Sequence, residues 1–370
     1  MVITPYSDQY WPSLAEFLVA RYPGMPLKGD RLYFQWRFAE NPLGSALEKC
    51  FLAVDDERVV GQACTIRDRL WDGNAWCDCY WLVDLMVSPE HRRGMAGIEL
   101  FQAAMSACPT LLSVGFTHRT SVLHRGLKWQ RGPSMTSRFV VVRPSQLAAI
   151  AQSSARSNAF AAAALRLSDR IVGPLQAAKT QIYRLRPQKL KVEVVDRFDA
   201  RFDEIVERAL DWNMIQPFRG SAYLTWKFGS RPCGAHFTLV AREPGSSGIR
   251  GYMVVKLKSR PRLARWADIA DFVVRPDDTV AFRSLLNEAI GRAISCGVDF
   301  VRIRYSGAWQ IPPGIRPIGI RRERPVDAIA YHSNVLSVAT QLNQRSWALT
   351  GIVSDLMDHG ADEWDLCERQ

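Results

Sequence analysis

Apolar and polar positions in residues 1–143 follow the periods of both strands and helices. Two short apolar runs at 51–54 and 59–61, separated by a pair of aspartates, predict two strands joined by a turn. A long aromatic and β-branched run from 76 to 87 predicts one or two central strands, because such residues pack well on a pleated surface. The pattern of this part is therefore rich in strands.

A helix is expected directly after the central run. Residues 95–107 place Ile98, Phe101 and Met105 on one face at helical spacing. A further strand is expected at 111–116, where the apolar run is short. Strands and helices thus alternate, and we expect a mixed α/β (α+β) domain.

An aromatic, proline and glycine pattern occurs twice in the chain. The matched positions lie 190 residues apart and are Tyr33, Trp36, Phe38, Pro42, Gly44 and Gly61 in the first copy and Tyr223, Trp226, Phe228, Pro232, Gly234 and Gly251 in the second. The stretch 83–89 also recurs, at 270–276, with Asp84 matched by Asp271. Because self-similarity at a fixed offset marks repeated structural units, we predict two tandem domains of the same fold.

The repeat and the composition between its copies divide the chain. The predicted parts are a first α/β domain at 1–143, a helical linker rich in Ala and Arg at 144–188, a second domain at 189–345 and an acidic tail at 346–370. Leu165, Ile171 and Leu175 have helical spacing in the linker, and Pro174 should kink or end that helix. We expect the linker to pack on one or both domains; a helix lying on a membrane surface fits less well, since Ala is weakly apolar.

The composition is that of a globular protein with a basic surface. The 370 residues are 47% hydrophobic and 23% charged, with a net charge of +11. This charge favours an acidic partner, such as a nucleotide, an anionic substrate, nucleic acid or a membrane surface, or it is simply a solvated surface. Eight scattered cysteines without a Cys-x-x-Cys pair indicate reduced thiols and a cytoplasmic protein without a structural metal. No apolar run reaches the length of a membrane span.

A candidate anion site follows the central strand. The strand at 82–87 continues into a basic, glycine-containing loop at 89–97 and then into the predicted helix. The backbone N–H groups of a first helical turn lack intrahelical acceptors, and the helix dipole attracts negative charge. Arg92 and Arg93 add charge-assisted donors. The loop is therefore suited to a phosphate.

The sequence Val-Ser-Pro-Glu-His-Arg-Arg-Gly-Met-Ala-Gly-Ile-Glu-Leu from Val87 resembles the acyl-CoA loop of the GNAT superfamily of N-acetyltransferases. Pro89, Arg92, Gly97 and Leu100 match the family pattern, whereas Arg93 and Met95 replace small residues. A second register, with His91, Gly94 and Ala96 at the key positions, stays open. The resemblance implies acetyl-CoA or another acyl-CoA as co-substrate, held by Met86, Val87, Arg92, Arg93, Gly94, Met95, Ala96 and Gly97.

The resemblance also implies a mechanism and candidate catalytic residues. In such proteins an amine attacks the thioester directly, and backbone N–H groups near Met86 and Val87 would polarise the acyl carbonyl. Asp84 is a candidate base, because it shares a strand face with Met86; its repetition as Asp271 leaves a structural role open. His124 stands where many members carry the tyrosine that protonates the CoA thiolate, and could also be a surface histidine.

The acceptor is less well defined. Trp36 and Arg37, followed by Asn41 and Pro42, resemble bacterial GNAT proteins of polysaccharide or cell-surface pathways. The resemblance implies that Trp36 and Arg37 line a substrate cleft for a small-molecule amine or an amino sugar. The oligomeric state is not indicated by the sequence.

The second domain departs from the family pattern. Asp277 and Asp278 stand where the phosphates would bind, and like charge would repel them. Tandem proteins with one silent domain resemble mycothiol-synthase-like and Fem-type transferases. We therefore expect two tandem GNAT-like domains, each a mixed twisted sheet flanked by helices, with the second one degenerate. The alternatives are a Fem-like transferase that uses aminoacyl-tRNA, the one form in which nucleic acid is a partner, and a silent GNAT-like scaffold.

Overall fold

The computed structural model describes residues 1–146, 159–185, 189–230, 235–260, 264–306, 328–350, 352 and 362–363. Its first half contains β1 (Val2–Pro5), α1 (Trp11–Arg21), α2 (Arg31–Phe38), β2 (Phe51–Asp55), β3 (Arg58–Trp71), β4 (Trp76–Val87), α3 (Ala96–Ala107), β5 (Thr110–Val114), α4 (His118–Gly126) and β6 (Gln130–Val141). The helix α6 (Ala159–Leu185) follows. Pro232, Gly234 and most of the predicted tail lie outside the described residues.

The second half repeats this order of elements. It contains β7 (Lys191–Val195), α7 (Ala200–Ala209), β8 (Gln216–Pro217), α8 (Ser221–Leu224), β9 (His236–Arg242), β10 (Gly251–Arg260), β11 (Ala264–Val274), α9 (Thr279–Ser295), β12 (Phe300–Ser306), β13 (Ala328–Ser333), α10 (Leu336–Gln344) and β14 (Asp362–Glu363). The expected central strand is a single strand, β4, and the expected helix at 95–107 is α3.

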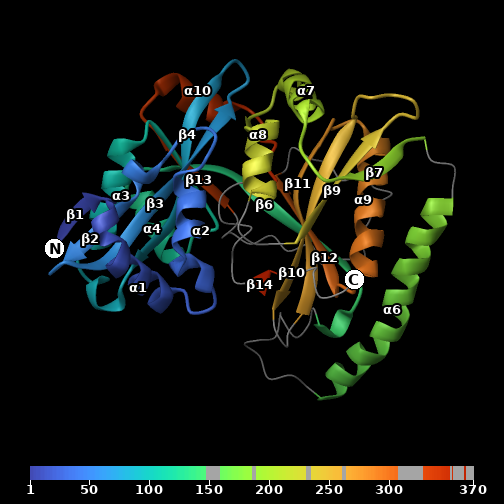
Figure 1. Ribbon diagram of the computed structural model, residues 1–370, viewed down its shortest axis with the longest axis horizontal. Helices are drawn as coiled ribbons and strands as arrows, with labels where there is room; N and C mark the ends of the chain where they lie inside the picture. Colours follow the sequence, from blue (N-terminus) through green and yellow to red (C-terminus); the bar gives the residue numbers. More distant parts are fainter. Residues whose placement is uncertain are drawn as a thin grey trace.

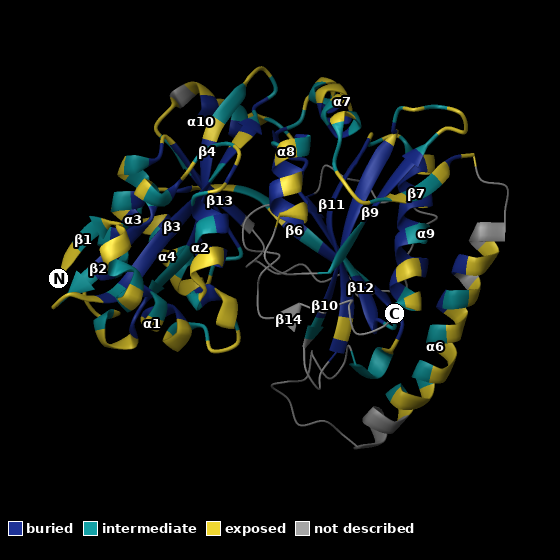
Figure 2. Ribbon diagram, viewed as in Figure 1, coloured by how far each residue is buried: buried dark blue, intermediate teal, exposed yellow. Residues whose placement is uncertain are grey.

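One mixed sheet runs through both halves. Its order is β1-β2-β3-β4-β5-β13-β6-β12-β11-β10-β9-β7, with β8 beside β3 and β14 beside β10. The pairs β4–β5 and β11–β12 are parallel, one in each half, and the other pairs are antiparallel. Helices cover the faces of the sheet, and its central strands are buried (Figures 1 and 2). The prediction of a mixed α/β fold in two similar units is confirmed.

The two halves exchange their last strands. The second part of β6 in the first half pairs with β12, from Met135↔Ser306 to Val141↔Phe300. In return β13 of the second half pairs with β5 of the first half, from Val114↔Ile329 to Thr110↔Ser333. Each half-sheet is therefore completed by a strand from the other half.

The repeated tryptophans form the centre of the contact between the halves. The indole N–H of Trp36 donates to the carbonyl oxygen of Trp226 at 2.9 Å, and the indole N–H of Trp226 donates to the carbonyl of Trp36 at 2.8 Å. The two rings stack with centroids 5.4 Å apart, and both side chains are buried. Because each residue makes the contact that its counterpart makes, the halves meet through an approximately twofold interface.

The repeated glycines mark a close approach of helix and sheet. A Cβ atom on Gly61 would lie 3.1 Å from the Leu100 side chain of α3 and from the Met86 carbonyl. A Cβ on Gly251 would lie 2.8 Å from the side chain of Val274. The expectation that Gly61 marks a tight backbone approach is confirmed, and the same packing explains why the glycine recurs.

The linker helix α6 lies at the outer edge of the molecule beside α9 (Figure 1). It continues through Pro174, so of the two predicted outcomes, a kink or an end, the end of the helix is wrong and the kink stays a prediction. A proline removes one backbone N–H from a helix and crowds the carbonyl one turn earlier, but flanking turns can keep the helix continuous. The remainder of the predicted linker, at 147–158 and 186–188, lies outside the described residues.

The tryptophan pair gives a prediction for stability. Trp36→Ala removes a buried ring and the indole donor to the Trp226 carbonyl, so we expect the free energy of unfolding to fall by about 3–5 kcal/mol. Leu32→Ala, an exposed position on the same helix, is the matched control and should change it by less than about 0.5 kcal/mol. Urea unfolding monitored by far-ultraviolet circular dichroism measures the free energy of unfolding of both variants. Equal losses in the two variants would contradict the role assigned to the tryptophan pair.

Candidate functional site

A cavity opens in the first half where β4 and β5 separate. The two parallel strands pair only at Tyr80↔Leu111 and Trp81↔Leu112. Beyond that point β4 bulges: its register with β3 shifts opposite Cys64, and Asp84 has a φ of 55°. Such a bulge changes the direction of the strand, and the edge of β4 that faces β5 is left without a partner strand. The gap holds a cavity of about 170 Å³.

Three segments line this cavity. They are the loop and helix region before α2, the bulged end of β4, and the turn that joins β5 to α4. The lining residues are Tyr22, Met25, Lys28, Leu82, Val83, Asp84, Leu85, Met86, Ser113, Val114, Gly115, Phe116, Thr117 and Thr120. The walls therefore combine apolar side chains with hydroxyls and one buried charge pair, as small-molecule sites do.

Asp84 lies in this wall with two cationic partners. Lys28 Nζ is 2.6 Å from one carboxylate oxygen and Arg37 Nη1 is 2.7 Å from the other. All three side chains are buried. Two cations stabilise the ionised carboxylate, so the position is one that holds a negative charge firmly. To act as a base, the Asp84 carboxylate would have to accept a proton although both partners stabilise its charged form. The role of Asp84 as a base stays a prediction.

The repeated aspartate of the second half is held in the same manner. Arg219 Nε lies 3.0 Å from Asp271, and the Tyr252 hydroxyl donates to the other carboxylate oxygen at 2.7 Å. All three are buried. A charged partner for the aspartate is thus common to both halves, which is a structural reason for its repetition.

His124 on α4 is buried outside the set of residues that line the cavity. Its ring lies against Phe101, Phe116 and Trp129, with centroids 4.5–5.4 Å away. Neither ring nitrogen has a hydrogen-bond partner among the described residues. Burial lowers the pKa of His124 to about 4, so the ring is neutral near pH 7. Its role as the proton donor to a thiolate stays a prediction.

The predicted substrate residues lie behind the cavity wall. Trp36 faces Trp226 in the contact between the halves, and Arg37 reaches the cavity only through its ion pair with Asp84. Neither is among the residues that line the cavity. Both are placed to support the wall, and direct contact with a substrate stays a prediction.

The basic loop lies between the end of β4 and the start of α3. Arg92 turns back, and its Nε donates to the carbonyl of Val87 at 2.9 Å. Arg93, Gly94 and Met95 are exposed, and the first turn of α3 carries no side-chain cap. The Ile98 N–H donates to the Met95 carbonyl at 2.9 Å, so the N–H groups of Ala96 and Gly97 and the helix dipole are available to an anion. The choice between the two registers of the loop stays open.

In the second half the corresponding helix is α9, and a carboxylate of the chain lies at its start. The Asp278 carboxylate accepts from the backbone N–H of Ala281 at 3.0 Å and thereby caps α9. The same carboxylate forms an ion pair with Arg250 at 2.7 Å. The positive end of this helix is thus occupied by the chain itself.

The corresponding gap of the second half is also filled by the chain. Beyond the paired residues of β11 and β12, Leu349 O accepts from the N–H of Ser306 at 2.9 Å, and Thr350 forms a bridge with Tyr305. The Thr350 hydroxyl donates to Asp271 on the opposite strand. Segment 346–350 therefore lies between the two strands where the first half has its cavity. Tyr305, buried here, occupies the place of Val114, counted from the last residues that pair with the neighbouring parallel strand.

Several cavity residues were not found from the sequence. Tyr22 and Lys28 lie in a stretch without periodicity and reach the cavity only through the packing of α1 and α2. The sequence gives a weak indication for Ser113 and Gly115, since they lie at the end of a predicted strand. They precede Thr117, whose side chain caps α4 by accepting from the N–H of Thr120. A strand end beside a bulged parallel neighbour is the usual place for a ligand.

No protein-family model and no curated protein matches the sequence. Solved structures share its fold. A GCN5-related N-acetyltransferase from Anabaena variabilis matches 91% of this chain and 74% of its own, with a TM-score of 0.59 and 14% identity. A probable N-acyltransferase of unknown function from Enterococcus faecalis matches 91% and 73%, with a TM-score of 0.56 and 9% identity. A tandem GNAT protein from the clavulanic acid biosynthesis pathway matches 90% and 98%, with a TM-score of 0.51 and 14% identity.

These likenesses confirm the resemblance drawn from the loop and the repeat. The chain has a tandem GNAT fold. At these identities the likeness concerns the fold, and the substrates of the solved proteins are not carried over.

The buried histidine gives a prediction for pH. Because the folded state keeps the pKa of His124 near 4 while an unfolded histidine titrates near 6.5, stability is lost as the pH falls from about 6.5 to 4, by about 1.4 kcal/mol per unit. His124→Phe should remove this part of the slope in urea unfolding at pH 7 and pH 5. The exposed His118 on the same helix is the control, and His118→Gln should leave the slope unchanged. An unchanged slope in His124→Phe would contradict the assignment.

Proposed function

We propose that the protein is an acyl-CoA-dependent N-acyltransferase that uses the first half as its only acyl-CoA site. One observation carries the proposal. The first half combines an open cavity between β4 and β5 with an uncapped helix start, whereas the second half closes both with its own residues.

The residues of the first half fit a nucleotide thioester. The pyrophosphate would lie on the N–H groups of the first turn of α3, with Gly94 and Gly97 allowing close approach and Arg93 adding charge. The pantetheine arm would follow the edge of β4 that β5 leaves unpaired beyond Trp81. The backbone N–H groups near Met86 would polarise the acyl carbonyl.

The acceptor would be an amine of a small molecule or of an amino sugar. Its nitrogen would form the new bond to the acyl carbon while the thioester C–S bond breaks, and one proton passes from the amine to the sulfur side. We assign Asp84 and His124 to this proton movement as candidates.

The two other functions considered differ in what they bind. A Fem-like transferase would bind aminoacyl-tRNA through the basic surface, and its binding would weaken steeply with salt. A silent scaffold would bind neither ligand. No feature of the cavity favours either one over acyl-CoA.

The first test is ligand binding. Acetyl-CoA or desulfo-CoA at 100 times its dissociation constant should raise the free energy of unfolding by about 2.7 kcal/mol, which a thermal shift detects. Arg93→Glu should weaken binding by about tenfold or more, since a charge-assisted contact becomes a repulsion. Arg283→Glu, exposed near the matching helix start of the second half, is the control and should bind as the wild type does. The absence of a shift with any CoA would refute the proposal, and salt-sensitive tRNA binding in its place would favour the Fem-like function.

The second test is stoichiometry and turnover. Isothermal titration should give one CoA per chain, because Asp278 and segment 346–350 occupy the second site. Thiol release from acetyl-CoA should then depend on an added amine, measured across simple amines and amino sugars. Two equivalent sites per chain would contradict the assignment of the second half, and binding without any thiol release would favour the scaffold.

A further inference from the structure

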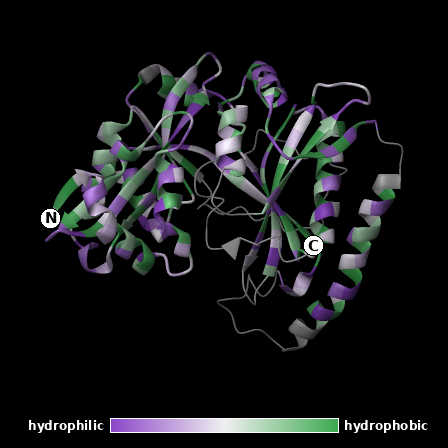
Figure 3. Cartoon of the chain, viewed as in Figure 1, coloured by the Kyte–Doolittle hydropathy of each residue, from purple (hydrophilic) through white to green (hydrophobic). Residues whose placement is uncertain are grey.

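The outer face of α6 is apolar. Leu167, Ile171, Leu175 and Ile182 are each 55–65% exposed. Their spacing places them within about 80° of the helix circumference and along about 22 Å of its length. Figure 3 shows apolar residues recurring along this outermost helix. Such a continuous row, in contrast to single exposed apolar residues, indicates an interaction surface.

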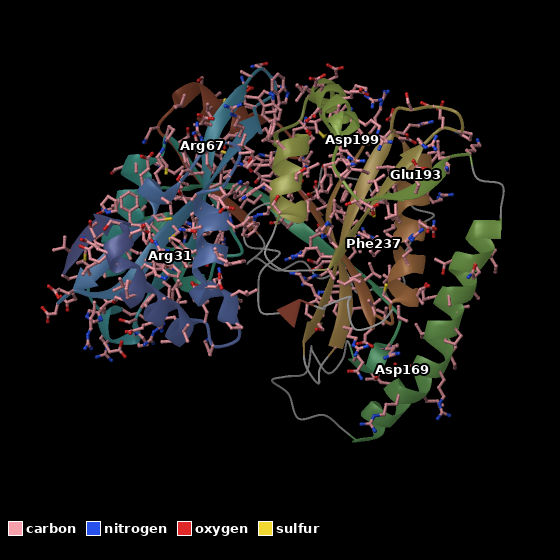
Figure 4. The ribbon with its side chains drawn as sticks, viewed as in Figure 1. Arg31, Arg67, Asp169, Glu193, Asp199 and Phe237 are labelled. Carbon is pink, nitrogen blue, oxygen red and sulfur yellow. The ribbon has the colours of Figure 1, made fainter. Side chains whose placement is uncertain are left out.

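The inner face of the same helix carries buried polar residues. Gln176 and Thr180 are buried, and the Thr180 hydroxyl donates to the carbonyl of Gln176 at 2.7 Å. Asp169 accepts from the N–H and the hydroxyl of Ser145 at 3.0 and 2.5 Å, on the side that faces the body of the protein (Figure 4). Leu165 and Val172 are half-buried on this side too, so the helix packs on the protein through a mixed face and leaves a row of four apolar residues exposed.

The charges beside the row identify the kind of partner. Arg166 and Arg170 are exposed and lie about 100° and 60° from one edge of the apolar arc. Asp169 is the one acidic residue within α6, and it is turned inward. A net charge far from zero opposes self-association, and the chain carries a net charge of +11. An apolar stripe with basic flanks instead fits the boundary between lipid headgroups and acyl chains.

We propose that α6 docks this protein on an anionic lipid surface. The four apolar side chains enter the acyl boundary, and the two arginines contact anionic headgroups. Within the part of the chain that the structure describes, no helix is long and apolar enough to cross a membrane, so α6 lies flat on the surface. This surface is separate from the acyl-CoA site and does not depend on it.

The test is co-sedimentation of the full chain with vesicles of phosphatidylglycerol and phosphatidylcholine, compared with phosphatidylcholine alone. We expect binding to the anionic vesicles that decreases with salt. Ile171→Gln with Leu175→Gln should abolish it, and Gln keeps the helix propensity high. Arg166→Gln with Arg170→Gln should weaken it by about fivefold for each arginine.

Matched variants elsewhere control for a general loss of apolar surface or charge. Leu32→Gln with Val122→Gln changes two exposed apolar residues of the first half, and Arg119→Gln with Arg125→Gln changes two exposed arginines of α4. Both control pairs should bind vesicles as the wild type does. Failure of the wild type to bind anionic vesicles, or equal binding by the α6 variants, overturns the proposal. A dimer in analytical ultracentrifugation that the Ile171 and Leu175 changes dissociate, without vesicle binding, would replace the lipid by a second copy.

Discussion

The rest of the structure depends on the hydrogen bonds of the two exchanged strands, β6 and β13, because they join the two half-sheets. Without β13, β5 has no neighbour on its outer edge, and without β6, β12 has none. A strand edge in the interior cannot stay unpaired, because buried N–H and C=O groups need partners. The two halves are therefore one cooperative body, and the reciprocal contact of Trp36 and Trp226 lies at its approximate twofold axis.

The two halves have the same architecture but differ in whether the gap between the parallel strands and the start of the following helix are open. In both halves a parallel strand pair separates next to the start of a helix. The first half leaves both features open, while the second fills one with Asp278 and the other with Leu349 and Thr350. Under the proposed function, the chain keeps the stabilising value of a duplicated fold and restricts ligand binding to one half. The closed half supplies the partner strand β13 and the facing tryptophan that the open half needs.

Sequence reasoning predicted the fold well because its signals are local or repeated. The helix α3, the strand β4 and the tandem arrangement follow from periodicity and from the spacing of Trp36 and Trp226. The strand exchange could not be predicted, since nothing in the pattern of β13 states which of two similar edges it joins. The roles of Lys28 and segment 346–350 could not be predicted for a related reason. These roles arise only when distant parts of the chain pack together. The exposure of the apolar row on α6 likewise depends on which face the rest of the protein covers.

The exchange also sets the order of events during synthesis. The strand that covers β5 is made about 200 residues after it, which at 5–20 residues per second is roughly 10–40 s. During that time the cavity half has its helices and most of its sheet but an open edge. Such an edge is a template for pairing with other chains until β13 is made. A fold that joins two domains so firmly in the finished protein thereby leaves the first of them incomplete until the second is nearly made.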